Sequence, residues 1–519
     1  MSLMSVLARM DAAAAGRAQP AATVRHRHLA ERPLVLVPLT TAGETGAPLG
    51  AMLGTDPEAP VTLVVPQPRD RDLRFAFLSS LADVLLPHLE SAQDDVEYEE
   101  RKEKDPETGK QTTVQAELCA DAPQLLVPNR PAADFVRLIG RSTRFRRTAE
   151  DDPEAAHPAP PRVPLLGRWL SQYGERARVP GSCLLLTMTE LLTRHWATGQ
   201  SQLEDQHLPS LLAWIDPPEG LGGAEAALRA ETGRDAEGQL LVPPAGPATD
   251  PAFDNRLLAP AIEAYDAGLP GAEERIHELI TSQLAPTWRD MWRGIELLRS
   301  LPEGGRVAER WKRDRWSYTA HRDRLRAGEP PQPRLDDAVT AAQKLAGREL
   351  AQARLEAHEA LDDPLAMAAR RLAGQAFAGE VTDVEMTWSE GKRPMPRPLV
   401  TVRTADEPQL SPGAKVYRAL PEGAQQAAEF VESPEQGLLT LRVVNGMGRG
   451  KEPAPGTVPA RGEAVCWTLF EHAPRGGPGL PAPEDTPWTH GGPPETAAAQ
   501  DELPPPAEPP DPVTAEDLL

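Results

Sequence analysis

The segment of this chain that most resembles a phosphate-binding loop runs from Asn445 to Glu452, as Asn-Gly-Met-Gly-Arg-Gly-Lys-Glu. A P-loop needs a glycine separated by four residues from its Gly-Lys pair and a Ser or Thr after the lysine. Backbone amides then surround the phosphates, and the hydroxyl reaches Mg²⁺. Asn445 and Glu452 occupy these two places. We therefore interpret the segment as a flexible β-hairpin loop.

Glycines also recur after the first apolar run of the chain, at Gly43, Gly46 and Gly50. The backbone amides of such a loop could hold a phosphate if the loop opened a helix. Asn129 and Arg130 follow a later apolar run, and open sheets bind ligands at the carboxyl ends of their strands. These five residues are our candidate ligand-binding residues. The competing interpretation is an ordinary connection between strands.

Histidines and acids gather between His195 and His207, with Glu204 and Asp205 among them. Their spacing contains neither His-Glu-x-x-His nor His-x-His, so it does not match the patterns that hold zinc. Ser201 and Glu204 have instead the spacing of a capping box. We predict surface or capping roles here, with no metal site and no cofactor. No Gly-x-Ser-x-Gly elbow occurs either, and no catalytic residue is assigned.

The most basic predicted helix covers residues 305–327. Its apolar face follows steps of four and three residues, and Trp316 lies off that face. Arginines on the other face would suit phosphate contacts while Trp316 stacks on a base. The candidate nucleic-acid-binding residues are Arg306, Arg310, Arg313, Trp316 and Arg324. The competing interpretation is a solvated outer face, since arginine supplies most of the 55 basic residues of this chain.

The composition is that of a globular protein. Of 519 residues, 40% are hydrophobic and 25% charged, which excludes a fibrous or membrane-embedded chain. The formal net charge of -22 opposes binding of nucleic acid or an anionic membrane over the whole surface. The three cysteines lie far apart without zinc spacing, and no apolar run reaches about 18 residues. We expect a cytoplasmic protein with no membrane association.

Proline, with 57 residues, is about twice as frequent as usual and marks the expected boundaries. The resulting prediction is a multidomain α+β fold with a small α/β module, a large all-α domain, an antiparallel β-barrel and a tail. The expected parts are a flexible N-terminus (1–30), the α/β domain (31–150), a linker (151–163), the helical domain (164–378), the barrel (379–472) and a disordered, acidic, Pro-rich tail (473–519).

Short apolar runs rich in β-branched residues predict buried strands at 32–39, 61–66 and 124–129. A helical pattern lies between the last two, and Pro87 should bend or end that helix. The charged segment 94–118 turns at an Asp-Pro-Glu-Thr-Gly sequence and predicts an exposed β-hairpin.

Helical periodicity dominates from residue 164 onward. We expect one helix at 182–198 and two more at 271–284 and 286–300, the latter beginning at Pro286. A further helix is expected at 335–361.

From residue 380 the period changes to two, and six runs of strand length follow one another between Gly, Pro, Ser and Asn turns. The runs are GEVTDVEMTW, RPLVTVRT, LSPGAKVYRAL, AAEFVES, GLLTLRVVNG and GEAVCWTLF. Their order over 380–470 resembles the small β-barrel of superfamily 1 helicases of the nonsense-decay type. In that family the barrel sits beside the motor and touches nucleic acid or a regulatory partner. Because no Walker A lysine or helicase motif occurs in this chain, the resemblance implies an accessory binding module without motor activity.

The leading hypothesis is a non-catalytic accessory or adaptor protein whose protein partner is a helicase or another nucleic-acid-processing ATPase. The segment Asp511–Leu519, acidic with an apolar end, could dock into a groove of that partner. One alternative is an enzyme acting on nucleotides or nucleic acid, with its site in 31–150. The other is a direct nucleic-acid binder that uses helix 305–327.

Overall fold

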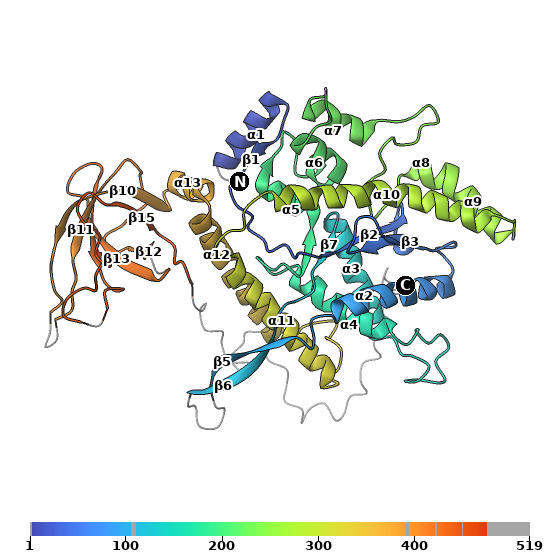
Figure 1. Ribbon diagram of the computed structural model, residues 1–519, viewed down its shortest axis with the longest axis horizontal. Helices are drawn as coiled ribbons and strands as arrows, with labels where there is room; N and C mark the ends of the chain where they lie inside the picture. The colour runs from blue at the N-terminus through green and yellow to red at the C-terminus, as the bar shows by residue number, and fades with distance from the viewer. Residues whose placement is uncertain (1–2, 105–110, 391–393, 421–422, 449, 475–519) are drawn as a thin grey trace, which may run out of the picture.

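The computed structural model describes all residues except 1–2, 105–110, 391–393, 421–422, 449 and 475–519. It confirms the multidomain α+β fold: helices and a mixed sheet form a large body, and a closed six-stranded barrel stands beside it (Figure 1). Nearly all of the tail predicted over 473–519 lies outside the described residues, as does the tip of the predicted hairpin.

A five-stranded sheet lies at the centre of the body, in the order β4-β3-β2-β7-β8. The strands are β2 (Leu34–Thr41), β3 (Glu44–Gly54), β4 (Val61–Val64), β7 (Leu125–Val127) and β8 (Leu185–Thr187). The first three in chain order form an antiparallel meander, whereas β2, β7 and β8 are parallel. Their side chains are mostly buried on both faces, which is why the strands read as continuous apolar runs.

Helices α2 (Arg71–Leu89), α3 (Arg130–Thr143) and α4 (Val163–Arg176) pack on one side of this sheet (Figure 1). The long helix α10 (Ala272–Arg299) crosses the other side. The body is therefore layered, with helices on both sides of a largely apolar sheet.

Shorter elements surround these layers. In chain order they are α1 (Leu3–Ala15), β1 (Gln19–Pro20), α5 (Met188–His195), β9 (Trp196–Ala197), η1 (Glu204–Gln206), α6 (Leu208–Ile215), α7 (Gly223–Thr232), α8 (Pro251–Phe253), η2 (Asp254–Leu258) and α9 (Ala259–Asp266). On the part of the chain that the structure describes, no helix is both long and apolar enough to cross a bilayer.

Helix α11 (Val307–Arg326) packs beside the hairpin formed by β5 (Val96–Lys104) and β6 (Gln111–Cys119). The hairpin predicted over 94–118 is thus confirmed in its described part. Tyr318 of α11 stacks on Trp169 of α4, with ring centroids 5.3 Å apart, and both side chains are fully buried.

One hydrophobic core runs through the whole body, from Ala12 to Tyr318. The segments predicted as an α/β domain (31–150) and a helical domain (164–378) share this core, and β8 of the second segment extends the sheet of the first. The stretch 151–163 therefore does not separate two cores in the structure.

Two expectations about helices in this region are wrong. The segment 182–198 contains strands β8 and β9 on either side of the short helix α5. Residues 271–284 and 286–300 form one helix, α10, with Pro286 inside it, just as Pro87 lies inside α2. Proline has no backbone N–H, so one hydrogen bond of α10 is missing at Pro286. The buried side chains of Leu284 and Trp288, on either side of Pro286 in the chain, hold α10 against the sheet.

Helices α12 (Ala338–Asp362) and α13 (Pro364–Leu372) lead from the body to the barrel. The barrel strands are β10 (Ala376–Glu385), β11 (Leu399–Thr404), β12 (Lys415–Ala419), β13 (Gln425–Glu432), β14 (Leu438–Val443) and β15 (Ala464–Thr468). They close in the order β10-β11-β14-β13-β12-β15 around a separate hydrophobic core that includes Phe377 and Trp467.

Candidate functional site

Two of the basic residues expected on the outer face of α11, Arg306 and Arg310, are engaged inside the molecule. Arg306 Nη1 lies 2.8 Å from Asp362 Oδ1. Arg310 is only 4% exposed, and its Nη2 donates to the backbone oxygen of His26 at 2.9 Å. The solvated position expected for Arg310 is therefore wrong, because the N-terminal segment and α12 cover this turn of the helix.

The other candidates on α11 are only partly available. Arg313 pairs with Glu309 one turn earlier. The guanidinium of Arg101 lies over the Trp316 ring, 5.2 Å from its centroid. Arg324 is exposed.

Hairpin β5–β6 supplies acids to the same helix. The ion pairs are Lys312–Glu99, Arg315–Glu97, Arg322–Glu117 and Arg326–Asp94. A groove of about 850 Å³ remains between the helix and the hairpin, and carboxylates and guanidinium groups both line it. The positive charge that favoured a nucleic-acid interface in the sequence is therefore largely matched within the structure.

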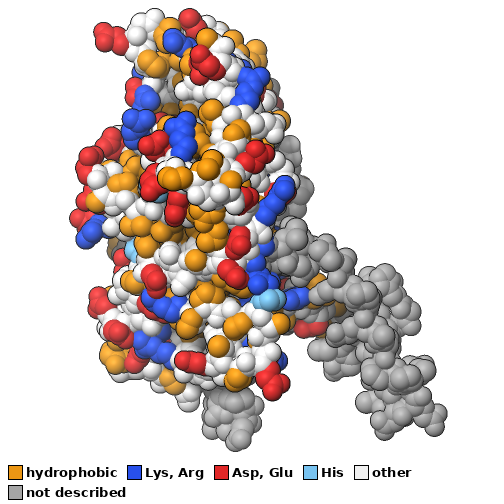
Figure 2. Space-filling view, turned by 90° about the vertical axis from the view of Figure 1, so that its right-hand side faces the viewer, with side chains coloured by type: hydrophobic (Ala, Val, Ile, Leu, Met, Phe, Trp, Pro, Cys, Tyr) orange, Lys and Arg blue, Asp and Glu red, His pale blue; other side chains and the backbone are white. Residues whose placement is uncertain are grey.

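One face of the molecular surface also mixes both signs of charge. Figure 2 views the molecule from the right-hand side of Figure 1, and basic and acidic side chains are interspersed across that face. Phosphate backbones favour broad positive surfaces, which this face does not present.

The glycines of the second candidate site do not form a loop that opens a helix. Gly43 lies in the tight turn between β2 and β3 with a φ of 107°, and Gly46 and Gly50 belong to β3 itself. A Cβ on Gly50 would come within 2.3 Å of the Leu63 oxygen on β4, so this glycine serves close strand packing. The condition for a phosphate loop, that it opens a helix, is not met, because residues 44–54 form strand β3, which pairs with β2 and, at residues 50–53, also with β4.

Asn129 does lie at the carboxyl end of β7, as predicted, but it caps α3. Its Oδ1 accepts from the Ala132 amide at 3.1 Å, and its Nδ2 donates to the Gly246 oxygen at 2.9 Å. Arg130 is exposed beside it. The structure does not bring the glycines and these two residues into one cleft: Asn129 is 5% exposed and already bonded.

Capping roles are confirmed for Glu204 and His207, whereas His195 and Asp205 are neither capping nor surface residues, being 1% and 3% exposed. The Ser201 amide donates to Glu204, and the Glu204 amide donates to Ser201 Oγ at 3.2 Å, as in a capping box. His207 Nδ1 accepts from the Ser210 amide at the start of α6. No group of three or more metal-ligating side chains occurs among the described residues.

The segment 445–452, described except for residue 449, lies in the chain between β14 and β15, which are not neighbours in the barrel. It is therefore a crossover and not the predicted hairpin loop. Asn445 Oδ1 accepts from the Ala427 amide at 2.6 Å, and Met447 is buried in the barrel core. These two contacts fix one side of the crossover.

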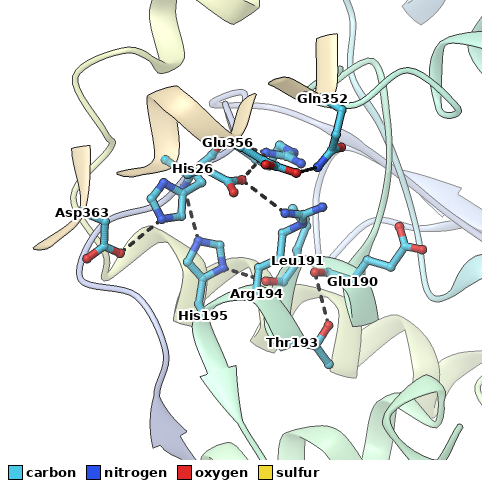
Figure 3. A network of polar contacts seen from close by, with 12 residues as sticks. His26, Glu190, Leu191, Thr193, Arg194, His195, Gln352, Glu356 and Asp363 are labelled. Atoms are coloured by element: carbon cyan, nitrogen blue, oxygen red, sulfur yellow. Dashed lines mark hydrogen bonds and ion pairs between the residues drawn. The ribbon is translucent and has the colours of Figure 1, made fainter. Parts of the chain in front are cut away.

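A buried polar network joins the N-terminal segment to α5 and to the α12–α13 junction (Figure 3). His26 Nε2 lies 3.2 Å from Asp363 Oδ2, and the His26 amide donates to His195 Nε2 at 3.3 Å. His195 Nδ1 lies 2.7 Å from the Leu191 oxygen, so this nitrogen carries the proton. Burial lowers the pKa of His195 to about 4, and the ring is neutral at pH 7.

Charged groups flank this pair of histidines. Arg27 and Arg194 both reach Glu359 of α12, at 3.3 and 3.2 Å. An Asp-His pair is a familiar arrangement for a general base, but His26 is only 5% exposed. The network therefore positions chain segments relative to one another.

Two consecutive aspartates at the α12–α13 junction tie several segments together. Asp362 accepts from the Arg306 amide at 2.9 Å as well as from its guanidinium. Asp363 accepts from the Thr23 amide and hydroxyl, at 3.0 and 2.9 Å, and from the Leu365 amide at 2.9 Å. Burial alone would raise the pKa of Asp363, but the hydrogen bonds from His26, Thr23 and Leu365 lower it to about 2.

The barrel side of this junction is hollowed into a groove of about 530 Å³. Its walls are the α12–α13 junction, the end of β12 and most of β15. Arg418 is buried in one wall and donates to Gln426 Oε1 and to the Thr457 oxygen, at 2.7 and 2.8 Å. Burial, with the nearby charges of Arg306 and His358, lowers the pKa of His472 in the groove to about 4. We name this cavity the junction groove.

Sequence reasoning did not find the junction groove or its polar partners. The Asp-Asp-Pro sequence at 362–364 carries a usable signal, because an aspartate before a proline is a common helix start. Nothing in the sequence pairs Asp363 with His26, which lies 337 residues away.

Comparisons with models of protein families, with curated proteins and with solved structures find no match to this chain. The resemblance of residues 380–470 to a helicase-associated barrel therefore stays a prediction.

Proposed function

We propose that this chain is an accessory adaptor protein that binds a protein partner through its β-barrel. The observation that carries the proposal is the way in which the barrel is attached to the body. It has its own core, it joins the body mainly through α12 and α13, and it stands to one side of the body (Figure 1). A small closed barrel held away from a large body is well placed to contact another protein.

The contacts that hold the barrel are chiefly polar. Arg371 on α13 makes two hydrogen bonds to Asp406, at 2.7 and 3.1 Å, and Asp406 also accepts from the Ala378 amide. Arg370 lies over the Phe470 ring. Such contacts resemble those between domains that keep a defined orientation without a shared core.

The resemblance of the strand order to a helicase-associated barrel makes a nucleic-acid-processing ATPase the partner to test first. Direct nucleic-acid binding through α11 has less support, because its arginines and lysine pair with the acids of β5–β6, Glu309 and Asp362. The enzyme alternative also has less support, since Gly46, Gly50 and Asn129 serve packing and capping.

The test is purification of the full chain from its source organism, with mass spectrometry of what accompanies it. We expect a partner in stoichiometric amount. Its recovery should fall at least tenfold when Arg403 and Arg442, exposed on the outer barrel surface, are changed to glutamate. The same change at exposed Arg229 and Arg275 of the body is the control. No stoichiometric partner, or equal recovery with the barrel variant, would contradict the proposal.

A further inference from the structure

The barrel closes between β12 and β15, and these two strands pair with each other over a very short length. The pairing of these two strands covers one residue pair among the described residues, Tyr417 with Thr468. By contrast, β15 pairs with β10 over five residue pairs, and β12 pairs with β13 over five. Beyond Tyr417–Thr468 the two strands separate, and the junction groove lies between their edges.

The backbone register shows which groups face this gap. The Glu463 oxygen accepts from the Val381 amide, and the Leu469 amide donates to the Gln375 oxygen, so the odd-numbered residues of β15 bond to β10. The even-numbered residues Ala464 and Cys466 therefore direct their N–H and C=O groups toward β12.

The same alternation applies to β12. The Leu420 amide donates to the Ala424 oxygen and the Phe430 amide to the Ala414 oxygen, so even-numbered residues bond on the β13 side. Ala419 faces the gap, and in a continued ladder it would lie opposite Cys466.

The side chains around the gap are small. Ala419 and Ala464 are exposed, Cys466 is half-buried, and Pro364 and Met367 of α13 form the opposite wall. Among the described residues no pair beyond Tyr417–Thr468 joins β12 to β15, and the side chains at these two strand edges are small. The gap therefore has room for an added extended peptide, which would pair with either edge by main-chain hydrogen bonds.

The charges at the gap favour a basic peptide. The groove is lined by Asp362, Asp363 and Glu463 against the single cation Arg418. Asp362 and Asp363 already have Arg306 and His26 as partners. Glu463 keeps 47% of its side chain exposed and lies 3.8 Å from the buried Arg418. Exposed Glu380 sits directly across the ladder from Ala464.

We infer that the gap between β12 and β15 is a binding site for an extended, basic segment of a protein partner, which adds as a strand to the barrel edge. The inference rests on the proposed adaptor function and assigns one contact of the partner to the junction groove, separate from the outer barrel surface that carries Arg403 and Arg442. The acidic segment beyond residue 474 of this chain is a poor occupant, since it would bring carboxylates to Glu463 and Glu380.

The probe is a fluorescent synthetic peptide, acetyl-KVTVKVT-amide, titrated into the full chain at about 150 mM salt and followed by anisotropy. A matched peptide with glutamate at both lysine positions tests charge, and one with proline at the valine positions tests main-chain pairing. We expect the basic peptide to bind at least tenfold more tightly than either control. Hydrogen exchange should slow at the amides of Ala419, Ala464 and Cys466.

Variants locate the site. Ala419→Trp fills the gap and should weaken binding at least tenfold. Glu463→Gln removes one carboxylate and should weaken binding about threefold, whereas Glu432→Gln, exposed elsewhere on the barrel, should change nothing. If circular dichroism shows that Ala419→Trp perturbs the fold, the comparison of Glu463→Gln with Glu432→Gln tests the site instead.

Binding that Glu463→Gln leaves unchanged, or equal binding of the acidic peptide, would overturn the inference. Amides of Ala419 and Cys466 that are already protected from hydrogen exchange without peptide would also overturn it. Protection that does not depend on protein concentration would identify a segment of this chain as the occupant. Protection that increases with protein concentration would identify a second copy of the chain. The adaptor proposal has its own readout in partner recovery with the Arg403 and Arg442 variants, so the two can fail separately.

Discussion

At the scale of single residues, the two ends of helix α12 show how differently one residue type can contribute. Asp337 caps α12, and its Oδ1 accepts from the Thr340 amide at 2.9 Å at the protein surface. Asp363 caps α13 in the same way but is 1% exposed, and it also accepts from Thr23 and His26. The second aspartate therefore also holds the N-terminal segment to the α12–α13 junction.

Asp363→Ala should lower the free energy of unfolding by about 3 kcal/mol or more, because the buried donors of Thr23, Leu365 and His26 lose their acceptor. Asp337→Ala is the matched control and should cost about 1 kcal/mol, as an exposed cap does. Urea denaturation measures both. Equal losses for the two variants would show that the Asp363 contacts add nothing beyond an ordinary cap.

At the scale of elements, sequence periodicity predicts the helices and strands that pack against segments close to them in the chain. All six barrel strands were placed within a few residues, because a period of two with Gly and Pro turns has few other interpretations. The run at 182–198 was misassigned, because three consecutive leucines suit a buried strand and a helix equally well. Only pairing with β7 decides for the strand at Leu185–Thr187.

The candidate site was harder to predict than the fold. The charge of α11 was visible in the sequence, but its neutralisation by Glu97, Glu99 and Glu117 depends on where the hairpin packs. Likewise, the gap between β12 and β15 is a property of how a barrel closes, and no residue type marks it.

Helices α3 and α4 cross at a contact that requires glycine. A Cβ on Gly167 would lie 2.4 Å from Thr143 Oγ1 and 2.5 Å from the Arg144 amide nitrogen. Gly167→Ala should therefore destabilise the protein by about 2 kcal/mol despite the better helix propensity of alanine.

The matched control for this crossing is Gly347→Ala. Gly347 lies inside α12 with no atom within 4 Å of the added Cβ, and the change should stabilise the chain by roughly 0.5–1 kcal/mol. Thermal unfolding followed by circular dichroism compares the two. A stabilising Gly167→Ala would mean that the helices can move apart at no cost.

At the scale of the whole molecule, buried neutral histidines make folding sensitive to acid. Burial lowers the pKa of His195 and His207 to about 4 and that of His321 to about 3. These groups regain a pKa near 6.5 when the chain unfolds. Between pH 6.5 and 4 the unfolded chain thus binds more protons than the folded one, and stability must fall as the pH falls through this range.

Below pH 4 a second contribution is lost. The pKa of Asp363 is depressed to about 2, so the stability that its hydrogen bonds provide is complete above its unfolded pKa of about 4 and disappears as the pH falls toward 2. Acid should therefore act in two stages, first through the buried histidines and then through Asp363.

Urea denaturation from pH 8 to pH 4.5 should show the free energy of unfolding constant down to about pH 6.5 and falling below it. Each buried histidine contributes about 2 kcal/mol of this fall between pH 6.5 and 5, since one pKa unit corresponds to about 1.4 kcal/mol. His195→Gln removes one titrating group, so its curve should be flatter by about that amount, whatever the variant costs at pH 8. His277→Gln, at an exposed position of α10, should leave the slope of the full chain unchanged. A His195→Gln curve parallel to that of the unmodified chain would mean that this histidine gains its proton in the folded state near its ordinary pKa, and that the network around His26 and Asp363 admits a charge at neutral pH.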